Sequence, residues 1–245
     1  MPKFVELWVY LSATPLFGLA ATLAVYVVAQ AAYTRFRQAP WANPVLWTVL
    51  VLAGGLLASG VPYPTYFAGA QFIHFLLGPA VVALAWPLWQ RRAELRQRWG
   101  KLLIAALMGG FAASASALFL ASVFGLPLEV MLSLAPKSVT APVAMGIAEK
   151  IGGIPALAAV FAVITGMVGA LTGKYLFDAL RIPTIYEGWV ARGFALGTAA
   201  HGIGAARALQ VNADAGAYAA LALSLQVLLA SLLMPILLPL FVRLL

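Results

Sequence analysis

Long apolar runs separated by short polar stretches make up most of the chain. A run of ~20 apolar residues crosses the ~30 Å hydrocarbon core of a bilayer as a helix. Six runs of this kind lie at about 7–32, 45–59, 67–90, 102–124, 154–177 and 217–245. Two further apolar segments, 128–150 and 193–209, are interrupted by polar residues. The pattern predicts an all-α polytopic membrane protein of about eight hydrophobic segments.

The two polar passages each combine a cation with residues that break helices. Pro136–Pro142 reads Pro-Lys-Ser-Val-Thr-Ala-Pro, and His201–Arg207 reads His-Gly-Ile-Gly-Ala-Ala-Arg. An ionisable side chain at membrane depth costs at least ~2.5–3.5 kcal/mol on insertion scales, so it normally faces a cavity, a partner or a substrate. Broken helices let irregular backbone line a cavity, and their freed N–H groups can bind an anion. Two such passages in one small chain predict a transport pathway.

Proline and glycine mark the positions where we expect helices to break. The 67–90 run is interrupted at Gly78–Pro79 and again at Pro87. In the polar passages the expected breaks lie at Pro136, Pro142 and Gly202. Proline removes a helix hydrogen bond and glycine weakens a helix, so broken or re-entrant helices are expected there.

Basic residues concentrate between the apolar runs. The net charge is +8, yet only 9% of residues are charged and the mean hydropathy is +0.98, which indicates a membrane protein rather than one that binds nucleic acid. Segment 91–101 carries Arg91, Arg92, Arg96, Arg98 and Lys101 against Glu94, which is typical of a cytoplasmic loop. The same rule places Arg35 and Arg37 inside if 45–59 and 67–90 form a hairpin, and the N-terminus is then outside.

Two topologies are compatible with the chain beyond residue 125. If 128–150 crosses the membrane completely, the polar segment 174–192 lies outside, against its three cations. If 128–150 is a re-entrant hairpin that opens outward, 174–192 lies inside and 193–213 enters from the opposite side. Opposed broken elements fit the inverted-repeat plan of secondary transporters. Counting positive residues favours the hairpins, by three cations to two acids.

Lys137, Ser138 and Thr140 form the first candidate binding group. A small anion in the membrane loses hydrogen bonds to water and needs a cation and donors in exchange. Lysine supplies the charge, while hydroxyls and helix N-terminal N–H groups supply direction. The alternative is a Lys137 side chain that reaches the membrane interface from a hairpin tip. Pro136 and Pro142 bracket the group and favour binding.

His201, Gly204 and Arg207 form the second candidate group. His201 lies among glycine and alanine, so backbone or substrate can approach it closely. An imidazole with an ordinary pKa near 6.5 can bind an anion or carry a coupled proton. The alternative is a histidine bonded to a neighbouring backbone carbonyl. Arg207 pairs either with the substrate carboxylate or with Asp214.

The sequence offers little for metal, cofactor or covalent chemistry. It has no cysteine, two histidines and seven scattered acids, so we expect no metal site and no cofactor. Ser138 with His201 suggests an intramembrane hydrolase, but neither a Gly-x-Ser-x-Gly motif nor an orienting acid accompanies the pair. We therefore expect a protein that is not an enzyme.

Four motifs in order resemble the LrgB/CidB family. Residues 77–88 resemble its PAVVALAxPL signature, and residues 134–145 resemble its LPKSVTTPIAM segment. Gly152–Ala156 matches as well, and residues 191–208 resemble ARGxAxGTASHAxGTARA. The chain departs from the family within 200–206, where alanines replace serine or threonine, and at Ala215, where an acid is expected. These departures bear on substrate choice.

The resemblance implies a multi-pass protein of the bacterial cell membrane. Relatives in that family are linked to transport of small monocarboxylates, which are pyruvate in bacteria and glycolate and glycerate in the plastid relative. The family also implies a small LrgA/CidA holin-like membrane partner. Older naming connects it with export or control of murein hydrolases.

These observations give two hypotheses of function. The first is a proton-coupled secondary transporter of small monocarboxylates, with the anion bound where the groups around Lys137 and His201 converge. Elevator-type alternating access would move these elements against spans 7–32, 45–59 and 102–124. The alternative is a regulator of murein hydrolase export and autolysis that acts with an LrgA/CidA-like partner. We expect a single LrgB-like domain that forms a homodimer, with scaffold spans in 1–66 and a transport core in 67–245.

Overall fold

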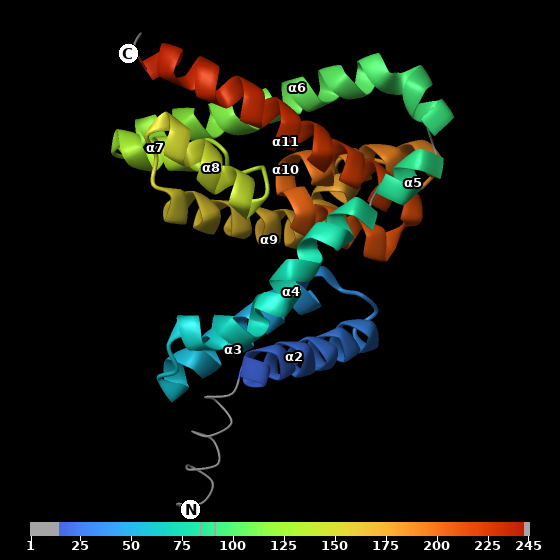
Figure 1. Cartoon of the computed structure of the whole chain (residues 1–245). Helices are drawn as coiled ribbons and strands as arrows, with labels where there is room; N and C mark the ends of the chain where they lie inside the picture. The colour runs from blue at the N-terminus through green and yellow to red at the C-terminus, as the bar shows by residue number, and fades with distance from the viewer. Residues whose placement is uncertain (1–14, 84, 91, 243–245) are drawn as a thin grey trace, which may run out of the picture. The chain divides into compact units, whose positions relative to one another are not determined.

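The computed structural model describes residues 15–83, 85–90 and 92–242, and within them all regular structure is helical (Figure 1). Within this described part of the chain, four helices are long and apolar enough to cross a membrane, at Leu16–Arg35, Arg92–Val123, Pro155–Ala179 and Ala213–Leu240. The predicted all-α polytopic membrane fold is confirmed. The chain forms two compact units, Met1–Ala85 and Trp86–Leu245.

The described residues of the first unit form three apolar helices. They are α2 (Pro15–Arg35), α3 (Pro44–Ser59) and α4 (Tyr63–Ala83), with the 3-10 turn η1 (Pro40–Ala42) between α2 and α3. The side chain of Asn43 caps α3 by accepting from the N–H groups of Val45 and Leu46, and Gly60 ends α3 in the left-handed conformation. Helices α2 and α4 approach closely because Gly18 lies against the carbonyl of Tyr66.

The aromatic stretch around Tyr63 forms the start of α4, and Pro64 suits the first turn of a helix. One expectation for the first unit is corrected. Gly78–Pro79 does not end a helix, since α4 continues through Pro79 to Ala83. Residues 7–14 of the first expected span lie outside the described residues.

The second unit begins with α5 (Ala85–Gln90) at the division and then the long helix α6 (Arg92–Val123). The described part of the expected basic loop forms the first turns of α6. Arginine, lysine and glutamate are good helix formers, and Glu94 pairs with Arg98 one turn later at 3.3 Å. A charged loop was therefore the wrong prediction for residues that continue the transmembrane helix.

A re-entrant hairpin, hairpin 1, follows α6. It consists of α7 (Leu128–Leu134), the loop 135–140 and α8 (Ala141–Ile151). Ser114 donates to the carbonyl of Ala135, so the chain has returned along α6 from Val123 by ~13 Å of helix rise. Helix α8 then leads back, because a Cβ on Gly153 would lie 2.9 Å from the amide nitrogen of Ser133 in α7.

The long helix α9 (Pro155–Ala179) starts where hairpin 1 ends (Figure 1). Alanines 144, 148, 158 and 162 are buried where α8 packs against α9. The hydroxyl of Ser133 accepts from the N–H of Ile154 at 2.7 Å and donates to the carbonyl of Glu129 at 2.6 Å. One side chain therefore joins α7 to the start of α9.

A second hairpin, hairpin 2, is formed by α10 (Tyr186–Val211), which is broken at Ala200 and His201. A Cβ on Gly204 would lie 2.6 Å from the carbonyl oxygen of Leu196, although residues eight apart in a straight helix are separated by ~12 Å. The second half of α10 therefore folds back along the first half. Asn212 then caps α11 (Ala213–Val242) by accepting from the N–H groups of Asp214 and Ala215.

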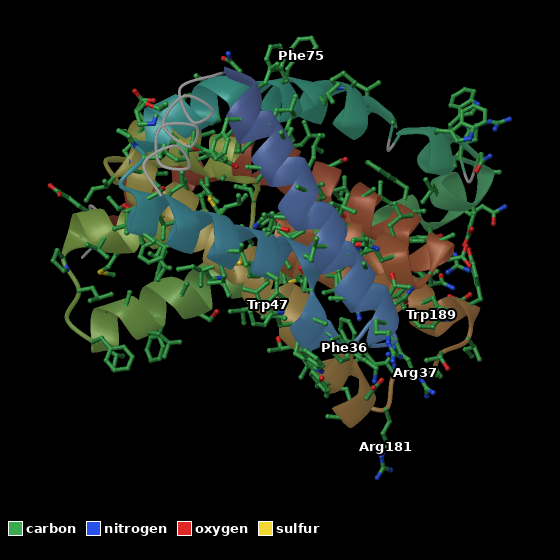
Figure 2. All side chains as sticks on the ribbon, turned by 90° about the horizontal axis from the view of Figure 1, so that it is seen from below. Phe36, Arg37, Trp47, Phe75, Arg181 and Trp189 are labelled. Carbon is green, nitrogen blue, oxygen red and sulfur yellow. The ribbon has the colours of Figure 1, made fainter. Side chains whose placement is uncertain are left out.

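One end of the second unit carries its ion pairs. Arg98 of α6 makes two hydrogen bonds of 2.8 Å to Glu187 of α10, and the arginine lowers the pKa of that carboxyl. Arg192 of α10 bonds Asp178 of α9 at 2.9 Å, while Arg181 projects away at the α9–α10 turn (Figure 2). The start of α6, the end of α9 and the base of hairpin 2 thus share one end, which we call the charged end.

These contacts decide between the two topologies left open by the sequence. Helix α6 starts at the charged end and runs to the opposite end, from which hairpin 1 enters. Helix α9 then runs back to the charged end, from which hairpin 2 enters. A long helix followed by a re-entrant hairpin therefore occurs twice, in opposite orientation. This is the inverted-repeat arrangement.

Candidate functional site

The tips of the two hairpins meet inside the second unit. A Cβ on Gly202, at the tip of hairpin 2, would lie 3.9 Å from Cγ2 of Thr140, at the end of the hairpin 1 loop. The two polar passages, which are far apart in sequence, therefore come together as the sequence predicts.

The tip of hairpin 1 contributes a cation and hydroxyls. The side chain of Lys137 is half-buried, and its Nζ lies 3.4 Å from Oγ of Ser138, a long contact. No carboxylate of the described residues lies within salt-bridge distance of Lys137. Ser138 is buried, and Thr140 begins α8 without capping it through its own side chain.

Pro136 and Pro142 lie where the sequence places the breaks. Pro136 is buried in the loop after α7, and Pro142 stands in the first turn of α8, where its missing N–H costs no helix bond. Helix α8 therefore starts at the hairpin tip with its N-terminal N–H groups directed toward the opposing hairpin. Such N–H groups and the helix dipole favour an anion.

His201 occupies the tip of hairpin 2 and is only 3% exposed. Its backbone has a positive φ of 42°, which is uncommon for any residue but glycine, and Gly202 follows the break instead of forming it. Nε2 of His201 lies 2.8 Å from the carbonyl oxygen of Ala162, and the ring packs against Gly166 of α9. The alternative of a carbonyl-bonded histidine is thus what the structure shows. Because a carbonyl only accepts, Nε2 carries a proton and Nδ1 remains for a ligand.

The other two residues of the second group lie on the returning half of α10. Gly204 allows the two halves to touch, since a Cβ there would also lie 2.7 Å from Cβ of Ala200. Arg207 is buried, at 6% exposure, one turn nearer the base of the hairpin. Gly204 therefore serves close packing, and Arg207 lies farther from the tips than His201.

A face of small residues on α6 supports both tips. Thr198 lies against Gly109, Gln226 of α11 lies against Gly110, and Ser114 holds the hairpin 1 loop. The amide of Gln226 also donates to the carbonyl of Ala106 in α6. The small residues of α6 thus permit close approach of three elements.

Sequence reasoning missed Thr198, Gln226 and Ser114 as members of this site. Gln226 is a single amide within the apolar run 217–245, and an isolated polar residue at membrane depth is a signal by itself. Thr198 and Ser114 gave weaker signals, because serine and threonine are common in packed membrane helices.

The arrangement suits a small anion. It offers hydroxyls, helix N-termini and a cation without an acidic partner in the described part of the chain. Ser138 is buried and Lys137 and Thr140 are half-buried, so each hydrogen bond there counts for more than in water. Among the described residues no group of three histidine or acidic side chains is placed to hold a metal ion.

Comparison with known proteins agrees with the motifs. The sequence profile described as LrgB-like family matches residues 22–240. The chain belongs to the LrgB-like family. It is 34% identical to the uncharacterised protein YxaC of Bacillus subtilis, over 90% of this chain and 94% of that relative. It is 29% identical to the holin-like protein CidB of Staphylococcus aureus, with the same two coverages. No solved structure matches this family member.

Proposed function

We propose that this LrgB-like protein is a proton-coupled secondary transporter of small monocarboxylates of the pyruvate, glycolate or glycerate type. The observation that carries the proposal is the meeting of two opposed re-entrant tips beside Lys137, which has no acidic partner among the described residues. Opposed broken helices near the membrane centre are the usual binding site of inverted-repeat transporters.

Lys137 is the residue that binds the substrate carboxylate. A half-buried ammonium without a carboxylate partner is costly, and a bound anion offsets that cost. Ser138, Thr140 and the first N–H groups of α8 complete the hydrogen bonds that the carboxylate loses with its water.

His201 carries the coupled proton. Its Nε2 bond to Ala162 fixes the ring, so a proton is gained or lost at Nδ1. A protonated His201 ring adds a positive charge beside the tips, and this charge favours binding of the anion. Proton binding and anion binding are therefore coupled. Arg207 is a second cation on the same hairpin and adds to the field that the anion meets.

The charged end supports an orientation of the protein in the membrane. Its cations outnumber its acids, so this end faces the cytoplasm of the bacterial cell. By the same rule Arg35 and Arg37 lie inside, and the N-terminus lies outside. Hairpin 2 then enters from the cytoplasm and hairpin 1 from outside. We assign the scaffold role to the first unit, the transport role to the second, and an elevator-type movement and a homodimeric assembly to the whole.

A second function is favoured by one comparison. The CidB relative carries the name holin-like protein. Together with what the family resemblance implies, this name favours a regulator of murein hydrolase export that works with a small LrgA/CidA-like membrane partner. The two functions are compatible, because a carrier that requires a partner subunit also regulates through it.

The deciding experiment measures pH-dependent uptake of labelled pyruvate and glycolate into proteoliposomes of the purified chain. Lys137→Ala is compared with Lys150→Ala, since Lys150 is exposed at the end of the same helix. We expect uptake that each acid competes for, that a proton gradient drives, and that only Lys137→Ala abolishes. A folded protein without uptake, alone and with an LrgA-like partner co-reconstituted, contradicts the transporter proposal.

A further inference from the structure

Thr198 has a buried hydroxyl that the site, as described so far, does not use. The residue is 6% exposed, and its Oγ1 has no hydrogen-bond partner among the described residues. Helical threonines ordinarily donate to the carbonyl four residues earlier. In this chain Thr22, Thr34, Thr48 and Thr172 all do so. Thr198 therefore leaves a strong donor and acceptor unused where an unmade hydrogen bond is costly.

The position of Thr198 places this hydroxyl beside the hairpin tips. It precedes the break at Ala200 and His201 by less than one helical turn. Its methyl group packs on α6, because a Cβ on Gly109 would lie 2.7 Å from Cγ2 of Thr198. Ser114, which bonds the hairpin 1 loop, lies only ~7.5 Å farther along α6.

The contacts of hairpin 2 show which face of α10 carries Thr198. Leu196 and Ala200 face α9 through Gly173 and Gly169, and Gly197 faces α11 through Ala219. Thr198 lies on the remaining side, toward α6, the helix that also receives the loop of hairpin 1. Its hydroxyl is therefore buried on the α6 side of α10, less than one helical turn before the tip of hairpin 2.

We propose that the hydroxyl of Thr198 binds the oxygen on carbon 2 of the substrate, so that the site selects 2-oxo and 2-hydroxy monocarboxylates over unsubstituted ones. This inference rests on the proposed transport function. Lys137 and the N–H groups of α8 satisfy the carboxylate, which leaves the neighbouring oxygen as the group still to be recognised. A hydroxyl donates to a 2-oxo group and accepts from a 2-hydroxyl group, so Thr198 serves both classes.

Selectivity follows from the cost of leaving Thr198 unpaired. A site built to hydrogen-bond a substrate oxygen discriminates strongly against the analogue that lacks it. Propionate differs from pyruvate only by the missing 2-oxo oxygen, and acetate differs from glycolate only by the missing hydroxyl. We expect the oxygenated acid of each pair to bind on the order of 10- to 100-fold more tightly.

The test compares these acids as inhibitors of labelled pyruvate uptake into proteoliposomes that contain the full chain. The variants are Thr198→Val, which keeps the shape and removes the hydroxyl, and Thr198→Ser, which keeps the hydroxyl. We expect Thr198→Val to raise the inhibitory concentration of pyruvate on the order of 10- to 100-fold and to leave that of propionate unchanged. Thr198→Ser should retain the preference for pyruvate.

Each other outcome is decisive. If Thr198→Val keeps the preference, Thr198 does not recognise the 2-oxygen, while the transport function stands. Equal weakening of pyruvate and propionate assigns Thr198 a packing role and also overturns the inference. If the wild-type protein transports neither acid, the transport function fails and the inference fails with it.

Discussion

The two hairpins enter the site from opposite ends but are built differently. Hairpin 1 has helices of 7 and 11 residues joined by the loop 135–140, and its lysine is half-buried. Hairpin 2 turns within two residues, and its histidine is 3% exposed and bonded to α9. One tip presents a charge on a loop, whereas the other is fixed on its neighbours.

Packing explains this difference. Hairpin 2 contacts α11 backbone to backbone, at Gly193 with Ala215 and at Gly197 with Ala219, so a side chain at either glycine has no room. Helix α8 of hairpin 1 packs through side chains, and a Cβ on its Gly146 would meet nothing within 4 Å. We infer that hairpin 2 with α9 and α11 forms a rigid template, while hairpin 1 is the element with freedom to move.

The largest effect is expected from placing a methyl group on this rigid template. Gly197→Ala would overlap the carbonyl of Ala219, and because backbone cannot move aside cheaply, we expect a loss of several kcal/mol of stability or no folded protein. Gly146→Ala in hairpin 1 is the matched control. It should be neutral or stabilising by up to ~1 kcal/mol, since alanine is the better helix former.

Thermal unfolding in detergent, followed by size-exclusion chromatography, measures both glycine variants. Equal tolerance of alanine at the two positions would contradict the proposed difference in rigidity between the hairpins. Loss of folding in both variants would contradict it as well.

The second prediction separates charge from packing at the two tips. Lys137→Met removes a cation without an acidic partner among the described residues, so we expect transport to be lost and stability to be unchanged or raised. His201→Ala removes the bond to Ala162 and the contact with Gly166, so we expect lower transport and a stability loss of about 1–3 kcal/mol.

Unfolding temperature and pyruvate uptake are measured on the same preparations of the two tip variants. If Lys137→Met lowers the melting temperature, Lys137 stabilises the fold, which contradicts the prediction. If His201→Ala leaves the melting temperature unchanged, the contacts of His201 with α9 do not stabilise hairpin 2.

The sequence predicts the polar tips better than it predicts helix boundaries. The sequence identifies the tips at Pro136, Pro142 and the His201 region. A charge beside helix-breaking residues is costly at membrane depth and is rare there without a functional role. Pro79 does not mark a break, because membrane helices tolerate an internal proline where neighbouring groups satisfy the freed backbone, and α4 continues through it.

Hairpin topology and the role of Thr198 depend on contacts that no local pattern encodes. The fold-back at Gly204 depends on the fit of that glycine against Leu196, and a glycine inside a helix is not by itself a hairpin signal. The interest of Thr198 is that its hydroxyl lacks the usual bond, which only coordinates reveal. Residues 92–101 were expected to form a loop but are helical. The number of positive residues indicates on which side of the membrane a segment lies, but it does not indicate the secondary structure of that segment.

The smallest effect is expected at the base of hairpin 1, where a single hydroxyl joins α7 to α9. Ser133 is fully buried, and Ser133→Ala leaves the N–H of Ile154 without its partner, so we expect a stability loss of about 1–2 kcal/mol with substrate affinity unchanged. Ser116→Ala is the control, because Ser116 is exposed and bonds only its own helix. If hairpin 1 moves as one piece about this base, Ser133→Ala should also change the uptake rate, measured at saturating pyruvate, more than the apparent affinity. A change in affinity without a change in rate would contradict movement of hairpin 1 about this base.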